Sequence, residues 1–323
     1  MDDVSSGGDW TTPRPLGRRG PTVTGLGLGT APIGNMFTGV TDDDAHAAVD
    51  AAWEGGVRYF DTAPLYGHGV SERRLGRALR ERPRADYVLA TKVGRVLDPA
   101  GAERAPTIFT DVGELEPRFD YSRDAVLRSL DDSLTRLGID RVDVALVHDP
   151  DLHEDDAMAG AFPALVRLRD EGVVRAIGAG MNQSEMLERF VERVDLDCVL
   201  LAGRYSLLDR GGARLLSQCG ARGVGVVIGG VFNTGVLVDP DVYRTYDYAP
   251  ASAALLARAR RLRDVSAARG VDLGAAALQF VLRHPAVTTV LVGARSAAEI
   301  ELDLAFADAP IADDVLEGIA RTA

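Results

Sequence analysis

Short apolar segments alternate with amphipathic segments along almost the whole chain, and this alternation constrains the fold more than any other feature. Each apolar segment has the length of one buried strand, and the segments between them have the period and the capping residues of helices. We predict strands at residues 24–30, 57–60, 87–91, 142–147, 173–177, 198–201, 224–228 and 289–292. We predict helices at residues 41–54, 71–80, 122–137, 155–170, 184–194, 212–221, 251–269, 273–283 and 296–307. Eight strands alternating with helices favour an α/β fold of the (β/α)8 TIM-barrel type over two Rossmann halves.

The remaining segments are predicted from their turn residues and their lack of a period. Residues 1–12 are polar, and we expect a disordered tail there. Proline and glycine interrupt residues 12–23, which favours a short N-terminal hairpin that closes one end of the fold. Residues 94–121 and 229–250 show no clear period, so we expect long functional loops. No linker divides residues 13–323, which we predict to form a single barrel domain.

The bulk composition narrows the class of partner. Hydrophobic residues make up 46% of the 323 residues, and the net charge is −12. An acidic chain is a poor match for nucleic acid or an anionic membrane, both of which attract basic patches. The first residues lack the basic and apolar regions of a signal peptide, and no apolar run approaches the ~20 residues of a membrane helix. We therefore expect a cytoplasmic protein with a small-molecule substrate, and we make no prediction of its oligomeric state.

Polar side chains of four different types lie at or just after three successive predicted strands. Asp61 follows the strand at 57–60, and Tyr66 lies in the loop after it. Lys92 ends the next strand and is the only lysine among 36 basic residues. His148 ends the strand after that. Active sites of (β/α)8 barrels lie at the C-terminal ends of the strands, so these four side chains are expected to converge there.

The chemistry of this set indicates a tuned proton donor or acceptor. Tyrosine is a weak acid, with an ordinary pKa of about 10, and a neighbouring ammonium group stabilises its phenolate. Lys92 supplies a compact ammonium whose pKa responds to its surroundings, and Asp61 would hold it charged and oriented. His148 would donate a hydrogen bond to the reacting oxygen. The set contains no nucleophile and no electron sink, so redox chemistry at a C–O(H) centre requires a cofactor.

Several motifs resemble those of the aldo-keto reductase family. The matching segments are Tyr59-Phe-Asp-Thr-Ala-Pro-Leu-Tyr-Gly67, Thr91-Lys92, Leu146-Val-His148, Gly178-Ala-Gly-Met-Asn182 and Val292-Gly-Ala-Arg-Ser296. The resemblance covers residues 13–310 and implies that Asp61, Tyr66, Lys92 and His148 are the catalytic tetrad. Within the family the chain is most similar to the branch of L-fucose or D-threo-aldose 1-dehydrogenases and pyridoxal 4-dehydrogenases. Segments 200–208 and 229–237 carry this closer likeness.

The resemblance also implies a nicotinamide cofactor, NADP or NAD, bound by the loops after the last two strands. Arg295 would favour the 2′-phosphate of NADP, whereas Glu299 and Asp303 would favour NAD, so both cofactors stay open. Ala202, Met181 and Asp303 depart from the residues that most family members have at these positions. The implied cofactor-binding residues are Thr30, Asp61, Asn182, Tyr205, Val231, Phe232, Asn233, Gly235, Gly293, Arg295, Ser296, Glu299 and Asp303.

The resulting prediction is an NAD(P)-dependent oxidoreductase that oxidises an aldose at C1 to a lactone, or reduces a small aldehyde in reverse. Pyridoxal 4-dehydrogenase and general aldehyde reductase activities are the alternatives within the same chemistry. A non-catalytic subunit that senses the dinucleotide is an alternative of another class. A metal-dependent hydrolase is a third, because residues 148–156 hold two histidines and five acids. Their spacing matches no metal-ligand pattern known to us, and we predict no metal site.

Overall fold

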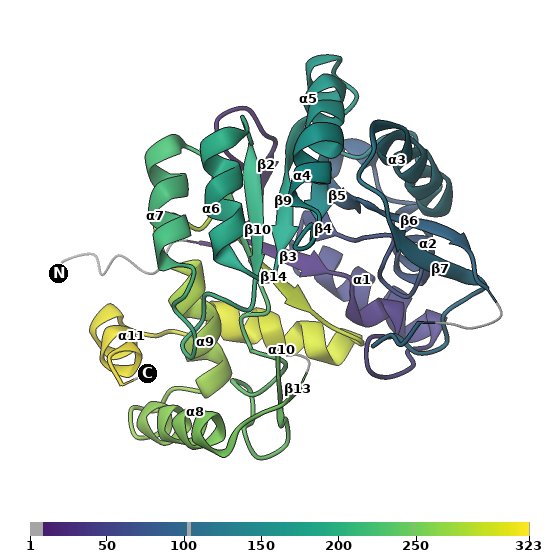
Figure 1. Ribbon diagram of the computed structural model, residues 1–323. Helices are drawn as coiled ribbons and strands as arrows, with labels where there is room; N and C mark the ends of the chain where they lie inside the picture. Colours follow the sequence, from purple (N-terminus) through teal and green to yellow (C-terminus); the bar gives the residue numbers. More distant parts are fainter. Residues whose placement is uncertain (1–8, 102–104, 248, 323) are drawn as a thin grey trace.

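The computed structural model describes residues 9–101, 105–247 and 249–322 (Figure 1). Eight parallel strands form a closed barrel in the order in which they occur along the chain. Almost all of their residues are buried, as expected for parallel strands covered on both faces. The (β/α)8 prediction is confirmed. The strands are β3 (Leu26–Gly29), β4 (Tyr59–Asp61), β5 (Val88–Val93), β8 (Val144–His148), β9 (Ala176–Met181), β10 (Cys198–Ala202), β11 (Gly225–Gly229) and β14 (Thr289–Gly293).

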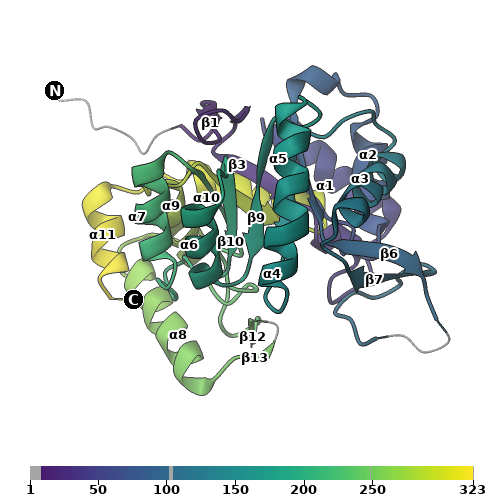
Figure 2. The same cartoon turned by 45° about the horizontal axis from the view of Figure 1, so that its top comes forward.

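Helices surround the barrel, as Figures 1 and 2 show. Predicted caps begin several of them: the hydroxyls of Thr41 and Ser122 accept hydrogen bonds from the backbone N–H groups of Asp44 and Ala125. The helices are α1 (Asp42–Glu54), α2 (Val70–Leu79), α3 (Arg123–Leu137), α4 (Glu154–Asp156), α5 (Phe162–Asp170), α6 (Ser184–Arg193), α7 (Ala213–Arg222), α8 (Ala253–Ala267), α9 (Leu273–Leu282), α10 (Ala297–Asp308) and α11 (Asp313–Ala320). Short 3₁₀ turns lie at η1 (Pro32–Gly34) and η2 (Arg84–Asp86), and a π-helical turn lies at η3 (Ala157–Ala161).

The predicted N-terminal hairpin closes the N-terminal end of the barrel. Strands β1 (Arg14–Pro15) and β2 (Thr22–Val23) pair antiparallel. Leu16 and Val23 are buried in the same cluster as inward-facing barrel residues such as Tyr59. Ahead of the hairpin, Trp10 is 6% exposed, and its indole N–H donates to Asp308 at 2.7 Å. The predicted tail at residues 1–12 therefore extends too far, because residues 9–12 are anchored to α10; residues 1–8 lie outside the described residues.

Two segments predicted as loops contain antiparallel hairpins outside the barrel. In residues 94–121, β6 (Arg95–Pro99) pairs with β7 (Leu115–Phe119). In residues 229–250, β12 (Thr245–Tyr246) pairs with β13 (Ala249–Pro250). These strands are mostly exposed or half-buried, so they lack the apolar run by which the barrel strands are recognised. The sequence prediction also missed α11 and the π-helical turn inside the helix expected at 155–170.

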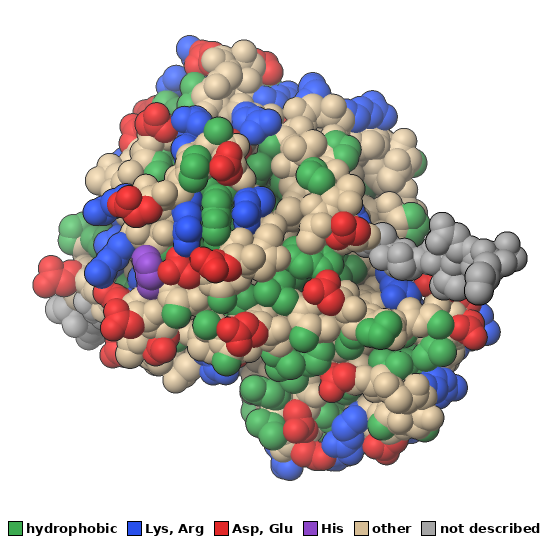
Figure 3. Space-filling view, turned by 180° about the vertical axis from the view of Figure 1, so that it is seen from behind, with side chains coloured by type: hydrophobic (Ala, Val, Ile, Leu, Met, Phe, Trp, Pro, Cys, Tyr) green, Lys and Arg blue, Asp and Glu red, His purple; other side chains and the backbone are tan. Residues whose placement is uncertain are grey.

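The molecular surface is mixed in charge. On the face seen in Figure 3, acidic and basic side chains are interspersed. No helix in the described ranges is long and apolar enough to cross a membrane. Cys198 and Cys219 are both buried free thiols.

Candidate active site

Three neighbouring barrel strands place the predicted tetrad at the C-terminal end of the barrel. Asp61 is the last residue of β4, Lys92 the penultimate residue of β5, and His148 the last residue of β8. Strand β4 pairs with β5, and β5 pairs with β8, so their ends are adjacent. Tyr66 lies in the loop between β4 and α2. The structure thus brings the four predicted side chains together.

Lys92 is the centre of the site and is only 1% exposed. Its ammonium donates to Asp61 Oδ1 at 2.5 Å, to the carbonyl oxygen of Thr62 at 3.0 Å and to Tyr66 Oη at 3.0 Å. These three contacts use all three ammonium protons. Burial by itself lowers the pKa of Lys92, but the charge of Asp61 and the Tyr66 hydroxyl outweigh it, so the pKa of Lys92 is raised. The ammonium therefore stays charged beside the tyrosine hydroxyl at neutral pH.

The loop that carries Tyr66 is packed directly against the backbone of η1. A Cβ on Gly34 would lie 2.8 Å from the carbonyl carbon of Tyr66, and a Cβ on Gly67 would lie 2.3 Å from the carbonyl oxygen of Gly34. Gly67 also has φ 61°, in the left-handed region that favours glycine. The backbone N–H of Ser71 donates to the carbonyl oxygen of Tyr66 at 3.2 Å, which ties the loop to the first turn of α2. Tyr66 is therefore held on a rigid loop.

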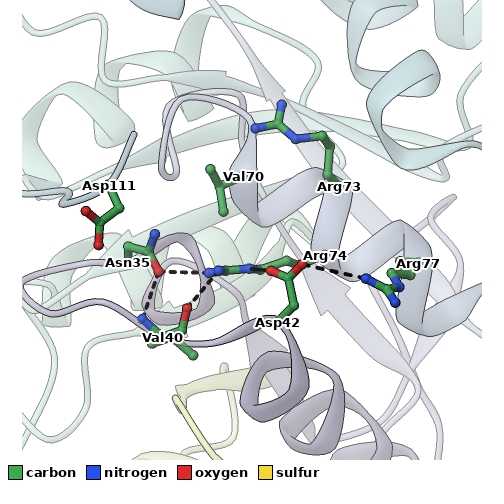
Figure 4. Close-up of a pocket in the computed structure, with 8 residues that line it drawn as sticks. All are labelled: Asn35, Val40, Asp42, Val70, Arg73, Arg74, Arg77 and Asp111. Carbon is green, nitrogen blue, oxygen red and sulfur yellow. Dashed lines mark hydrogen bonds and ion pairs between the residues drawn. The ribbon is translucent and has the colours of Figure 1, made fainter. Parts of the chain in front are cut away.

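Arg74 of α2 holds the segment on which this loop packs (Figure 4). Its guanidinium donates to the carbonyl oxygens of Ile33 and Val40 at 2.7 Å each, and to Asn35 Oδ1 at 2.8 Å. It also pairs with Asp42 at 2.8 Å. Every one of these acceptors lies between η1 and the start of α1, so one side chain fixes that whole segment against α2.

His148 faces Tyr66 edge to face, with ring centroids 5.8 Å apart and planes at 89°. Burial, and then the positive charges of Lys92 and Arg95, hold the pKa of His148 well below its usual range. The imidazole is therefore neutral at physiological pH and carries one N–H donor. Its Nδ1 is buried without a hydrogen bond to any described residue, whereas Nε2 lies 3.6 Å from Asp149 Oδ2. A neutral donor beside a tyrosine hydroxyl suits polarisation of a carbonyl oxygen.

The loop after β11 has the backbone expected of an anion site. Asn233, Thr234 and Gly235 all have positive φ, at 48°, 60° and 89°. The N–H groups of Thr234 and Gly235 bond to none of the described residues. Successive free N–H groups in such a conformation form a concavity that binds phosphate oxygens. Predicted residues Val231, Phe232, Asn233 and Gly235 lie in this loop, which fits the diphosphate of a dinucleotide.

The side chain of Asn233 is used inside the protein. Its Oδ1 accepts a hydrogen bond from the Ser206 hydroxyl at 2.6 Å.

Three other predicted cofactor residues lie elsewhere around the barrel. Thr30 is fully buried, and its hydroxyl donates to the carbonyl oxygen of Asp61 at 2.9 Å. Tyr205 is 6% exposed and stacks on Phe280 with centroids 5.6 Å apart. Asn182 directly follows β9 and is half-buried.

The start of α10 gathers the other predicted cofactor residues, which follow Gly293 at the end of β14. Ser296 caps the helix by accepting from the Glu299 N–H. Arg295 is engaged by Glu299: its Nε and Nη2 donate to Glu299 Oε1 at 3.0 and 2.6 Å, and its backbone N–H donates to Oε2 at 2.8 Å. Asp303 is 6% exposed, and burial followed by the charge of Glu299 raises its pKa to about 8. At this helix start Arg295 and Glu299 are therefore bound to each other.

The acidic segment after His148 is occupied by contacts other than metal ligation. His153 Nδ1 lies 3.2 Å from Asp156 Oδ2, and the ring of His153 packs on Phe119 with centroids 5.1 Å apart. Across the part of the chain that the structure describes, no three His, Cys, Asp or Glu side chains are grouped as metal ligands.

Residues from outside the barrel strands also reach the site. Phe109 lies 6.2 Å from Tyr66 between ring centroids. Arg95, at the start of the β6–β7 hairpin, pairs with Asp149 at 3.0 Å. Asp149 directly follows His148. Its position just after the end of a barrel strand is the only sequence signal that places it near the site.

Comparisons with known proteins identify the family and agree with the fold. Residues 25–322 match the model of the Aldo/keto reductase family. The chain is 43% identical to pyridoxal 4-dehydrogenase of Microbacterium luteolum, over 93% of this chain and 94% of that protein. It is 39% identical to D-threo-aldose 1-dehydrogenase of a Pseudomonas species, over 89% and 90% of the two chains. The holo form of an aldo-keto reductase from Bacillus halodurans superposes with a TM-score of 0.79 at 27% identity, covering 96% of each chain. The chain therefore belongs to the aldo/keto reductase family, whose members are NAD(P)-dependent oxidoreductases.

Proposed function

We propose that the protein oxidises the C1 hydroxyl of a cyclic aldose to a lactone and uses NAD as the hydride acceptor. The observation that carries the proposal is the buried Lys92 ammonium, which lies 3.0 Å from Tyr66 Oη and is held charged by Asp61. A permanent cation at this distance stabilises the phenolate of Tyr66, which is the proton acceptor that oxidation of a hydroxyl requires.

Each member of the tetrad has one task in this reaction. Tyr66, as phenolate, accepts the proton of the anomeric hydroxyl, and in the reverse direction its phenol donates that proton to the carbonyl oxygen. His148 donates a hydrogen bond to the same oxygen and fixes its position. Lys92 stabilises the phenolate, and Asp61 orients Lys92. The loop at Asn233–Gly235 and the start of α10 would hold the nicotinamide dinucleotide, which would supply the hydride acceptor that oxidation at C1 requires.

The named relatives support a cyclic hemiacetal as the substrate class. One is named for D-threo-aldose oxidation at carbon 1, and a third, 31% identical over 90% of this chain, is the L-galactose dehydrogenase of Arabidopsis thaliana. Pyridoxal is the second candidate, because the relative at 43% identity is a pyridoxal 4-dehydrogenase. Pyridoxal closes on its own hydroxymethyl group to a hemiacetal, so both candidates present the same reacting centre.

The contacts of Arg295 favour NAD over NADP. A 2′-phosphate is recognised by the open fork of a guanidinium, which binds two phosphate oxygens at once. Glu299 already occupies that fork with two side-chain hydrogen bonds. A phosphate dianion would have to displace this carboxylate, whereas the free ribose hydroxyl of NAD carries no such charge. We also place the protein in a reducing compartment, the cytoplasm, which suits two free thiols.

A reduction assay tests the proposal. The purified protein is mixed with NAD or NADP and with L-fucose, D-arabinose, L-galactose, D-glucose or pyridoxal, and nicotinamide reduction is followed by absorbance. We expect turnover with NAD and at least one sugar, and a lactone as the product. Turnover of pyridoxal alone selects the second candidate. Binding of NAD without oxidation of any hemiacetal contradicts the proposal.

A further inference from the structure

A carboxylate lies beside Nε2 of His148. Asp149 directly follows β8, and its Oδ2 is 3.6 Å from His148 Nε2. Its backbone has φ 42°, a left-handed conformation that aspartate adopts more readily than most residues. The carboxylate is thereby turned back toward the strand end, where the tetrad lies.

Arg95 holds this carboxylate from the β6–β7 hairpin. Its Nη2 donates to Asp149 Oδ2 at 3.0 Å, and its guanidinium lies over the ring of Phe119, 4.3 Å from the centroid. The hydroxyl of Tyr121 donates to the carbonyl oxygens of His148 and Asp149 at 2.7 and 2.9 Å, which fixes the backbone at this corner. The side chains of Arg95 and Asp149 are 18% and 22% exposed, so the pair is largely but not wholly enclosed.

The pair retains hydrogen-bonding capacity that the protein does not use. Asp149 Oδ1 accepts no hydrogen bond from any described residue. Arg95 Nε is buried and finds no acceptor among those residues. Burial raises the pKa of Asp149, and the positive charge of Arg95 offsets this only in part. A largely enclosed polar pair with unused hydrogen-bonding capacity beside His148 is suited to binding polar groups of a ligand.

We propose that Asp149 and Arg95 recognise the hydroxyl group on the carbon next to the reacting carbon of the substrate. This inference rests on the proposed function, because it takes the reacting oxygen to lie between Tyr66 Oη and His148 Nε2. An oxygen one carbon further along a substrate bound there is within reach of the Asp149 carboxylate. Asp149 accepts the proton of that hydroxyl in a hydrogen bond, and Arg95 keeps Asp149 ionised and oriented.

The chemical consequence is selection for α-hydroxy aldehydes and their hemiacetals. The C2 hydroxyl of an aldose fulfils the requirement, whereas the ring hydroxyl of pyridoxal lies one carbon further from the reacting carbon and does not. An aldehyde without this hydroxyl would offer no hydrogen-bond donor to Asp149 Oδ1. Sites of this kind reject analogues that lack the hydroxyl far more strongly than apolar pockets reject analogues that lack a methylene.

The test compares two aldehydes that differ in a single hydroxyl, lactaldehyde and propanal, as substrates for NADH-dependent reduction. We expect the parent protein to prefer lactaldehyde in kcat/KM. Asp149→Asn should reduce kcat/KM for lactaldehyde by about 10- to 100-fold, as loss of a charge-assisted hydrogen bond implies. The loss in kcat/KM should be clearly smaller for propanal, because propanal lacks the hydroxyl that Asp149 binds. The control is Asp98→Asn, which breaks a pair with Arg118 on the same hairpin.

A purely structural role predicts different results. If Asp149→Asn lowers kcat/KM for both aldehydes equally, together with the melting temperature, the assignment is overturned. The assignment is also overturned if the parent protein does not prefer lactaldehyde to propanal, or if it reduces neither aldehyde. The proposed function can fail while this inference stands. If the parent protein prefers lactaldehyde to propanal but oxidises no hemiacetal, the result supports recognition of the hydroxyl by Asp149 and Arg95 and contradicts the lactone-forming activity.

Discussion

Replacement of Lys92 by methionine separates the structural role of this residue from its catalytic role. Lys92 and Asp61 are 1% and 2% exposed, so removal of the ammonium leaves a carboxylate that water cannot reach. Breaking a buried pair from one side costs about 3–5 kcal/mol of unfolding free energy. We therefore expect the unfolding free energy of Lys92→Met, measured by urea unfolding, to be lower than that of the parent protein by this amount. The double variant Asp61→Asn/Lys92→Met should regain at least about 2 kcal/mol, the coupling typical of contacting charged residues.

The pH dependence of this loss has a definite sign. In the parent the pKa of Lys92 is raised, so the stability that it contributes is present below about pH 10.4, its unfolded value, and is lost only as pH rises through the folded value. In Lys92→Met the buried Asp61 binds its proton more tightly when folded than when unfolded. Stability of this variant therefore increases as pH falls, and its deficit relative to the parent should be smaller at pH 5.5 than at pH 8.5.

Activity should not follow stability in this series. The double variant is stable but lacks the cation beside Tyr66, so its turnover should stay as low as that of Lys92→Met, and any residual activity should rise toward higher pH. Urea unfolding and kcat against pH measure both quantities on the same preparations. Recovery of activity in the double variant, or an unchanged unfolding free energy in Lys92→Met, would refute the reasoning.

Two further predictions concern the cofactor and the packing of the helices. Glu299→Gln frees the Arg295 guanidinium, so the ratio of the dissociation constants for NADPH and NADH, measured by fluorescence titration, should fall about tenfold; an unchanged ratio would show that Glu299 does not exclude the 2′-phosphate. Gly76→Ala places a Cβ 2.0 Å from the carbonyl oxygen of Leu137, so α2 and α3 must separate at a cost of about 1–3 kcal/mol in urea unfolding. Its control, Gly318→Ala, has room for the methyl group in α11 and should be neutral or stabilising, and equal effects at the two glycines would contradict the packing argument.

Much of the barrel could be predicted from the sequence because each barrel strand is an apolar run bounded by turn residues. The positions of Asp61, Lys92 and His148 followed from the same pattern, since a parallel barrel aligns the ends of its strands. The pattern fails for the β6–β7 hairpin, most of whose residues are half-buried or exposed and whose strands pair with each other instead of with the barrel. It also fails for Trp10, whose partner Asp308 is 298 residues away.

The parts of the site that sequence analysis missed depend on that hairpin. Arg95 reaches Asp149 only because β6 turns out of the barrel directly after β5 and carries the guanidinium back over the strand ends. Nothing in the local sequence of residues 94–121 encodes this path. At the start of α10, the sequence predicts that the charge of Glu299 favours NAD. It does not predict the direct contacts between Glu299 and Arg295, because these depend on the side-chain conformations.

The central claim is that Tyr66 transfers the proton in an NAD-linked oxidation. Replacement of Tyr66 by phenylalanine removes the hydroxyl but keeps the ring that packs near Phe109 and His148. We predict that kcat for the best hemiacetal substrate falls by about 10²- to 10⁴-fold, the usual contribution of a general acid or base, while the dissociation constant for NADH changes by less than about twofold. Turnover of Tyr66→Phe within a few fold of the parent would contradict the account.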